Sequence, residues 1–102
     1  MPPVAGRWKG NLEVMATILG NRARWVALRE LAVHGHLPVA WLASRAEVTP
    51  SVMSQQMAVL KKAGVVVPAM GRLYALHPSL VPAQGAHYLD LGHAQLRLPP
   101  RM

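Results

Sequence analysis

Apolar residues recur at intervals of three or four along the first third of the chain, which is the spacing of one face of an α-helix. After Asn11, a residue suited to a helix N-cap, the apolar positions are Leu12, Met15, Ile18 and Leu19. After Asn21, a second cap candidate, they are Trp25, Leu28, Leu31 and Ala32. The pattern predicts one helix that ends near Gly20 and an amphipathic second helix that ends near His34.

Two shorter helices are predicted after the break at Gly35 and Pro38. The segment from Val39 to Glu47 is long enough for two helical turns, and its inward residues are Val39, Leu42 and Ala46. Thr49 and Pro50 then form a helix start, because threonine caps well and proline lacks a donor that would be unpaired there anyway. Gly64 suits the end of that helix. Two helices joined by so short a turn form a helix-turn-helix candidate.

The pattern changes after Gly64. Residues 65–67 and 72–77 favour two strands around a short turn, which is a β-hairpin with Arg72 next to its tip. A helix-turn-helix followed by a hairpin is a winged helix. The predicted fold class is therefore α+β and mostly helical, with about four helices, a β-hairpin wing and an extended C-terminal tail. In the tail, alternation that shifts near Gly92 predicts either one bent strand or two short strands.

The length of 102 residues and the apolar content of 52% fit one compact domain. We divide the chain into a basic N-terminal arm (1–10), a winged helix-turn-helix DNA-binding domain (11–77) and a C-terminal extension (78–102) that could form strands and support dimerisation. The sequence has no cysteine, so disulfides and thiolate metal sites are excluded. No signal peptide or apolar run of about 18 residues is present, and we expect a cytoplasmic protein.

The charge balance indicates a polyanionic partner. Eleven Lys and Arg residues against four Asp and Glu give a formal charge of +7 and a pI near 11.3. In so small a domain this excess favours double-stranded DNA, although a merely solubilising charge would look the same. We expect no membrane partner, because the sequence shows neither a basic amphipathic helix nor a lipidation signal.

The predicted helix over residues 50–63 has two chemically different faces. Its inward stripe is Met53, Met57 and Leu60, and its outward face is Ser51, Ser54, Gln55, Ala58 and Lys62, with Gln56 and Lys61 at the margins. Hydroxyl and amide groups can pair with base edges, and lysines can reach phosphates. A plain solvated face is the alternative, but no acid occurs between Glu47 and Asp90. The predicted DNA-binding residues are Pro50, Ser51, Ser54, Gln55, Gln56, Lys61, Lys62, Arg72, Arg45, Arg24 and Arg22.

Three segments in order resemble the ArsR/SmtB family of bacterial winged-helix repressors. They are LGNRARWVALREL, VAWLASRAEVTPSVMSQQMAVLKKAGVV and GRLYAL, within residues 12–77. The resemblance implies a homodimeric transcriptional regulator, a repressor, that binds an imperfect inverted repeat. It implies that the helix over residues 50–63 enters the major groove, while the wing over residues 65–77 contacts the backbone or minor groove through Arg72. Two-fold symmetry would separate the two recognition helices by about 34 Å.

The chain departs from this family at the metal site. Many members bind metal through a cysteine pair before the recognition helix, where this sequence has Pro38 and Ala40. The pair of His34 and His36 falls short of the four ligands that a structural zinc prefers, and the tail offers only His87, Asp90 and His93. We predict no metal and no cofactor, and the identity of any small-molecule or ion effector stays open.

An enzyme is not expected, because the four carboxylates are scattered and no catalytic motif is present. Two other functions stay open: a winged-helix protein-interaction module with an acidic partner, and a sequence-neutral DNA-binding protein. Trp25 and Trp41 fit core or dimer-interface packing. We further expect the first helix and the tail to form the dimer interface through Leu12, Met15, Leu19, Leu89, Leu91 and Leu96.

Overall fold

A computed structural model describes residues 12–92 and 94–98 of the chain. The predicted basic arm, residues 1–10, lies outside the described residues, as does His93. No helix in the described residues is long and apolar enough to cross a membrane.

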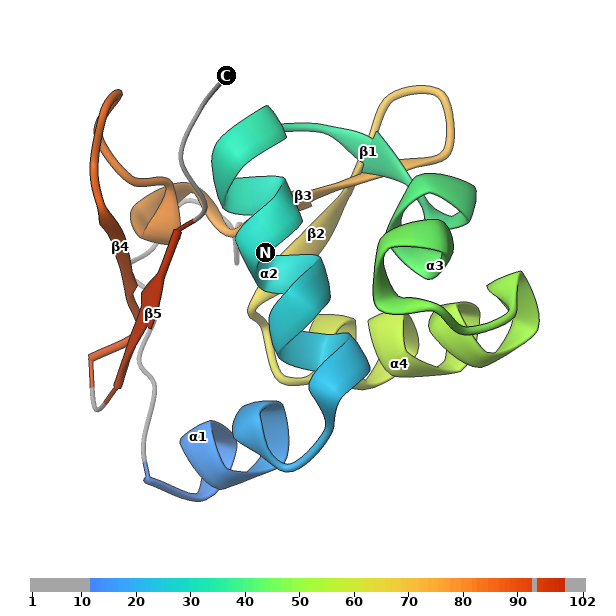
Figure 1. The fold of residues 1–102 in the computed structure, drawn as a ribbon, viewed down its shortest axis with the longest axis horizontal. Helices are drawn as coiled ribbons and strands as arrows, with labels where there is room; N and C mark the ends of the chain where they lie inside the picture. The colour runs from blue at the N-terminus through green and yellow to red at the C-terminus, as the bar shows by residue number, and fades with distance from the viewer. Residues whose placement is uncertain (1–11, 93, 99–102) are drawn as a thin grey trace.

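Four α-helices form the larger part of the fold. They are α1 (Leu12–Leu19), α2 (Arg22–His34), α3 (Val39–Ala46) and α4 (Pro50–Lys62). Figure 1 shows α2 at the centre of the molecule, with α1 below it and the α3–α4 pair to its right. The predicted helices are confirmed, and with the hairpin they confirm the predicted mostly helical α+β fold class.

The helix boundaries follow the capping signals in the sequence. Oδ1 of Asn21 accepts a hydrogen bond from the Ala23 backbone N–H at 2.9 Å, and Oγ1 of Thr49 accepts one from the Val52 N–H at 3.2 Å. Each bond satisfies a donor that the first helical turn leaves without a partner. Gly64 follows the end of α4 with a φ of +80°, a conformation that a glycine adopts without steric cost.

The wing is built from β2 (Val66–Ala69) and β3 (Leu73–Leu76), paired antiparallel from Val66 opposite Leu76 to Ala69 opposite Leu73. A third strand, β1 (Leu37–Pro38), pairs with β3 and completes a sheet of order β1-β3-β2. The sequence did not predict β1, because two residues are too short to show a periodic pattern. Pro38 is compatible with this edge strand, where a missing N–H donor costs little.

The tail contains a 3₁₀ turn, η1 (Pro78–Leu80), and two short strands, β4 (Tyr88–Asp90) and β5 (Gln95–Arg97). The strands pair antiparallel, with Leu89 opposite Leu96. Of the two predicted alternatives, two short strands is therefore the correct one. Figure 1 shows this hairpin on the opposite side of α2 from α3 and α4.

One core joins the tail to the helices, and this overturns the predicted dimer interface for three of its six residues. Met15 is 2% exposed, and Leu89 and Leu91 are fully buried among core residues of the same chain. Side chains enclosed in this way cannot face a second copy, so the prediction is wrong for these three. Leu19 is 40% exposed, and Leu96 is partly buried against the core. Trp25 also packs partly buried against the core, whereas Trp41 is 40% exposed.

Candidate nucleic-acid interface

The two faces of α4 separate as predicted. Met53, Met57 and Leu60 are fully buried and fix the helix against the core. The exposed residues of the helix are Pro50, Ser51, Val52, Ser54, Gln55, Ala58, Lys61 and Lys62. The outward surface therefore combines hydroxyl, amide, small apolar and cationic groups, and it carries no carboxylate.

The turn from α3 to α4 is fixed by backbone hydrogen bonds. The Glu47 N–H donates to the Ser44 carbonyl at 3.3 Å and the Val48 N–H donates to the Ala43 carbonyl at 3.1 Å, which is the Schellman pattern. Glu47 adopts the left-handed conformation, with φ 60° and ψ 43°, which is unfavourable for a residue with a side chain. This turn sets the direction in which α4 leaves α3.

Arg22 binds this same turn. Its Nη1 donates a hydrogen bond to the Ala46 carbonyl at 2.7 Å, and its Nη2 lies 3.6 Å from Oε1 of Glu47. The carbonyl belongs to the last turn of α3, where the helix leaves acceptors without partners. Arg22 therefore holds the end of α3 from the first turn of α2, a role that the sequence pattern did not indicate. Its side chain is still 55% exposed.

Arg24, two residues further along α2, binds α4 directly. Its Nε donates to Oε1 of Gln56 at 2.7 Å, and its Nη1 donates to the carbonyl of Thr17 in α1. Gln56 is partly buried, whereas its neighbour Gln55 is exposed. The structure thus places the two glutamines in different surroundings, although the sequence grouped both among the predicted DNA-binding residues.

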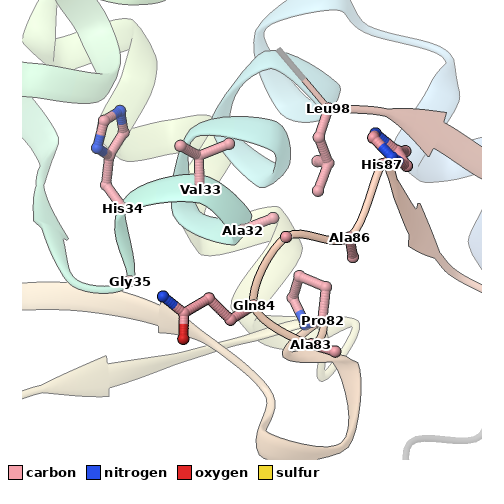
Figure 2. Close-up of a pocket in the computed structure, with 11 residues that line it drawn as sticks. Ala32, Val33, His34, Gly35, Pro82, Ala83, Gln84, Ala86, His87 and Leu98 are labelled. Atoms are coloured by element: carbon pink, nitrogen blue, oxygen red, sulfur yellow. The ribbon is translucent and has the colours of Figure 1, made fainter. Parts of the chain in front are cut away.

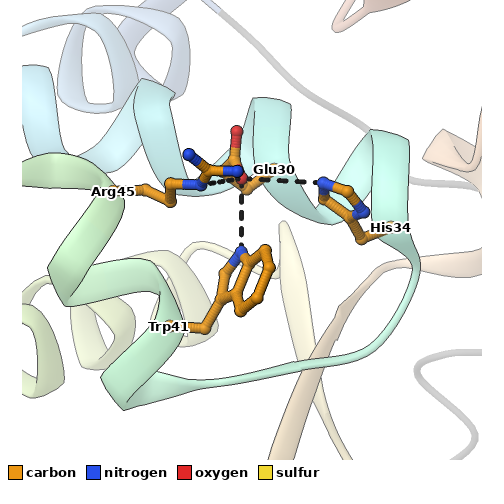
Figure 3. A network of polar contacts seen from close by, with 4 residues as sticks. All are labelled: Glu30, His34, Trp41 and Arg45. Atoms are coloured by element: carbon orange, nitrogen blue, oxygen red, sulfur yellow. Dashed lines mark hydrogen bonds and ion pairs between the residues drawn. The ribbon is translucent and has the colours of Figure 1, made fainter. Parts of the chain in front are cut away.

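Arg45 belongs to a polar cluster around Glu30, shown in Figure 3. Oε1 of Glu30 accepts a hydrogen bond from Trp41 Nε1 at 3.2 Å, lies 3.2 Å from Arg45 Nε and lies 3.8 Å from His34 Nε2. The Arg45 guanidinium also lies 5.2 Å from the centre of the Trp41 ring, within range of a cation–π contact. The Glu30 side chain is only 14% exposed, and its contacts tie α3 to α2.

The wing tip is the loop Met70–Arg72. Gly71 and Arg72 both have positive φ, at 74° and 64°, and Arg72 is exposed. Met70 is 90% exposed. In the view of Figure 1 the wing loop and the N-terminal end of α4 both lie toward the right of the molecule, with α3 between them.

A pocket of about 480 Å³ lies between the C-terminal end of α2 and the loop before β4. Figure 2 shows His34 and His87 at opposite sides of the pocket, with the Gln84 side chain near Gly35. Its other lining residues are Ala32, Val33, Pro82, Ala83, Gly85, Ala86 and Leu98. Within residues 12–92 and 94–98, no three histidine or carboxylate side chains form a group that could hold a metal ion.

Comparison with known proteins gives one structural likeness. No protein-family model matches the chain, and no curated protein matches it. The structure is similar to that of HlyU from Vibrio cholerae N16961, with a TM-score of 0.54 and 29% sequence identity. The match covers 64% of this chain and 73% of the HlyU chain. HlyU is a winged-helix regulator, and the present chain has the same winged-helix regulator fold.

Proposed function

We propose that the chain is a sequence-specific DNA-binding transcriptional regulator that acts as a homodimer. In this proposal α4 enters the major groove, and the wing, residues 65–77, contacts the backbone or the adjacent minor groove. The observation that carries it is the outward face of α4, where Ser51, Ser54 and Gln55 are exposed on a helix anchored by three fully buried side chains. The likeness to HlyU supports the same function class.

The chemistry of this face fits base edges in a major groove. The serine hydroxyls and the Gln55 amide can each donate and accept hydrogen bonds, and a glutamine can pair with adenine through both groups at once. Ala58 is small enough for close approach, and Val52, which is 39% exposed, offers an apolar contact for a thymine methyl group.

The exposed cations fit the phosphate backbone. Lys61 and Lys62 lie at the C-terminal end of α4, and Arg72 lies at the wing tip. Arg22 and Arg45 hold internal contacts but keep 55% of their side-chain surface exposed. Each cation that neutralises a phosphate releases a counterion, so the affinity should fall steeply as salt is raised.

The dimer and a repressing role complete the proposal. Two recognition helices about 34 Å apart would match successive major grooves on one face of an inverted repeat. We expect twice the monomer mass of 11.1 kDa in sedimentation equilibrium at micromolar concentration, and a monomeric mass would contradict the dimer. Transcription from the bound promoter should fall when the protein is added, and a rise would identify an activator.

The main experiment measures binding to DNA from upstream of the gene and to a scrambled duplex across a salt series. We expect tighter binding to the upstream DNA, and a loss of discrimination of about 1–3 kcal/mol for Ser54→Ala or Gln55→Ala. Lys62→Ala should instead lower the salt slope by about one. The matched control is Gln95→Ala, which replaces an exposed glutamine in the tail hairpin. It should change neither the discrimination between the duplexes nor the salt slope.

Equal affinity for the two duplexes would identify a sequence-neutral binder. No affinity for either duplex at low salt would exclude DNA as the partner and favour an acidic protein.

A further inference from the structure

The two adjacent glutamines of α4 differ in their partners. Gln55 is exposed in the middle of the outward face. Gln56 is partly buried, and its Oε1 accepts a hydrogen bond of 2.7 Å from Nε of Arg24. Consecutive helical residues point about 100° apart, so Gln56 lies at the edge of the face, toward α2.

The Arg24 contact determines which way the Gln56 amide is turned. A guanidinium has donors only, so the Gln56 atom that faces it must be the oxygen and not the nitrogen. The amide NH₂ group therefore presents two donors away from Arg24. Pairing with adenine requires an acceptor and a donor in a set geometry, and here the bond from Arg24 occupies one lone pair of the acceptor and fixes its direction.

Arg24 is itself held by a second element. Its Nη1 donates to the Thr17 carbonyl in the last turns of α1, so its guanidinium is fixed between α1 and α4. An arginine has five N–H donors, and these two contacts occupy two of them. The remaining donors of Arg24 and the NH₂ of Gln56 make a cluster that can donate hydrogen bonds but accept few.

We propose that Arg24 and Gln56 together bind a DNA phosphate, and that Gln56 is not a base contact. A phosphate oxygen accepts hydrogen bonds and carries negative charge, which suits a fixed guanidinium and an amide NH₂. The edge position of Gln56 agrees with this role, because backbone contacts flank the groove that the centre of the helix enters. The inference rests on the proposed function. Within that function, Gln56 positions α4 on the DNA backbone, whereas its neighbour Gln55 discriminates between base sequences.

The test compares Gln55→Ala with Gln56→Ala on the upstream and scrambled duplexes. Gln56→Ala should weaken binding to both duplexes by a similar factor, about threefold to tenfold, and leave their affinity ratio unchanged. Gln55→Ala should lower the ratio. Ethylation interference supplies a second readout: Gln56→Ala should reduce interference at one phosphate, and Gln55→Ala should leave that phosphate unaffected.

Gln56→Glu separates a phosphate contact from a structural role. The carboxylate keeps an acceptor for Arg24 but removes the NH₂ donors and adds a charge that repels phosphate. We expect wild-type thermal stability and a loss of affinity for both duplexes larger than that of Gln56→Ala, most evident at low salt. Arg24→Lys should lower the salt slope little, because the charge remains, but should reduce interference at the same phosphate as Gln56→Ala.

A reduced affinity ratio for Gln56→Ala, or wild-type binding by Gln56→Glu, would overturn this inference alone. Failure of the unmodified protein to bind either duplex would overturn the proposed function and this inference with it.

Discussion

The α3–α4 unit, residues 39–62, and the tail hairpin, residues 88–97, are held in place by different means. In the first, Thr49 caps the start of α4, and backbone bonds at Glu47 and Gly64 close the two helices. In the second, strands of three residues are fixed by Leu89 in the common core, and Arg29 donates to the Arg97 carbonyl at 2.7 Å. Local signals thus define the unit that carries the candidate interface, whereas long-range packing defines the hairpin.

The largest effect should come from the buried leucines of the two regions. Leu60 in α4 and Leu89 in β4 are both fully buried, so replacing either by alanine should lower the free energy of unfolding by about 2–5 kcal/mol. Urea unfolding followed by circular dichroism measures this. Tyr88→Ala, at a position that is 49% exposed, is the control and should cost much less. A cost for Leu89→Ala below about 0.5 kcal/mol would mean that the hairpin is not part of the cooperative core.

The next effect concerns the two left-handed positions at which α3 and α4 end, Glu47 and Gly64. Gly64→Ala should destabilise the protein by about 1–2 kcal/mol, because an alanine at φ +80° meets the steric cost that glycine avoids. Glu47→Gly removes the same steric cost at φ +60°, so it should stabilise the protein or leave its stability unchanged. Thermal unfolding of both variants checks the signs, and destabilisation by Glu47→Gly would show that its side chain is needed.

A smaller effect is expected at the cap of α4. Thr49→Ala removes the acceptor for the Val52 N–H and should cost about 1 kcal/mol. Thr49→Ser retains a hydroxyl and should behave like the unmodified protein. Chemical denaturation measures both, and an equal loss in the two variants would assign the effect to the threonine methyl group instead.

The smallest effect should come from a local hydrogen bond between a side chain and the backbone in the tail hairpin. Oδ1 of Asp90 accepts a hydrogen bond of 2.8 Å from the Gly92 N–H in an exposed turn. Asp90→Ala should cost about 0.5 kcal/mol, because water replaces the lost acceptor. Asp90→Asn keeps an acceptor and is the control. If Asp90→Ala cost as much stability as Thr49→Ala, the tail hairpin would depend on its local contacts as much as the α3–α4 unit does.

The sequence predicted more of the fold than of the candidate site. All four helices and the wing were predicted, because their apolar spacing and capping residues are local signals. The two-residue strand β1 was missed, since its existence depends on Leu37 pairing with Tyr74 far along the chain. The internal roles of Arg22 and Arg24 were also missed. An exposed arginine and one bound to a distant carbonyl or amide look the same in a one-dimensional pattern.

The sequence by itself determined that α4 would bury Met53, Met57 and Leu60 and expose Ser51, Ser54 and Gln55, because a helix of fixed pitch assigns each residue to a face. Only the tertiary structure decided that Gln56 accepts a hydrogen bond from Arg24, a residue 32 positions away. It also decided that Leu89 and Leu91 belong to the core of one chain. Such contacts depend on how separate elements meet, and the pattern within one element does not contain that information.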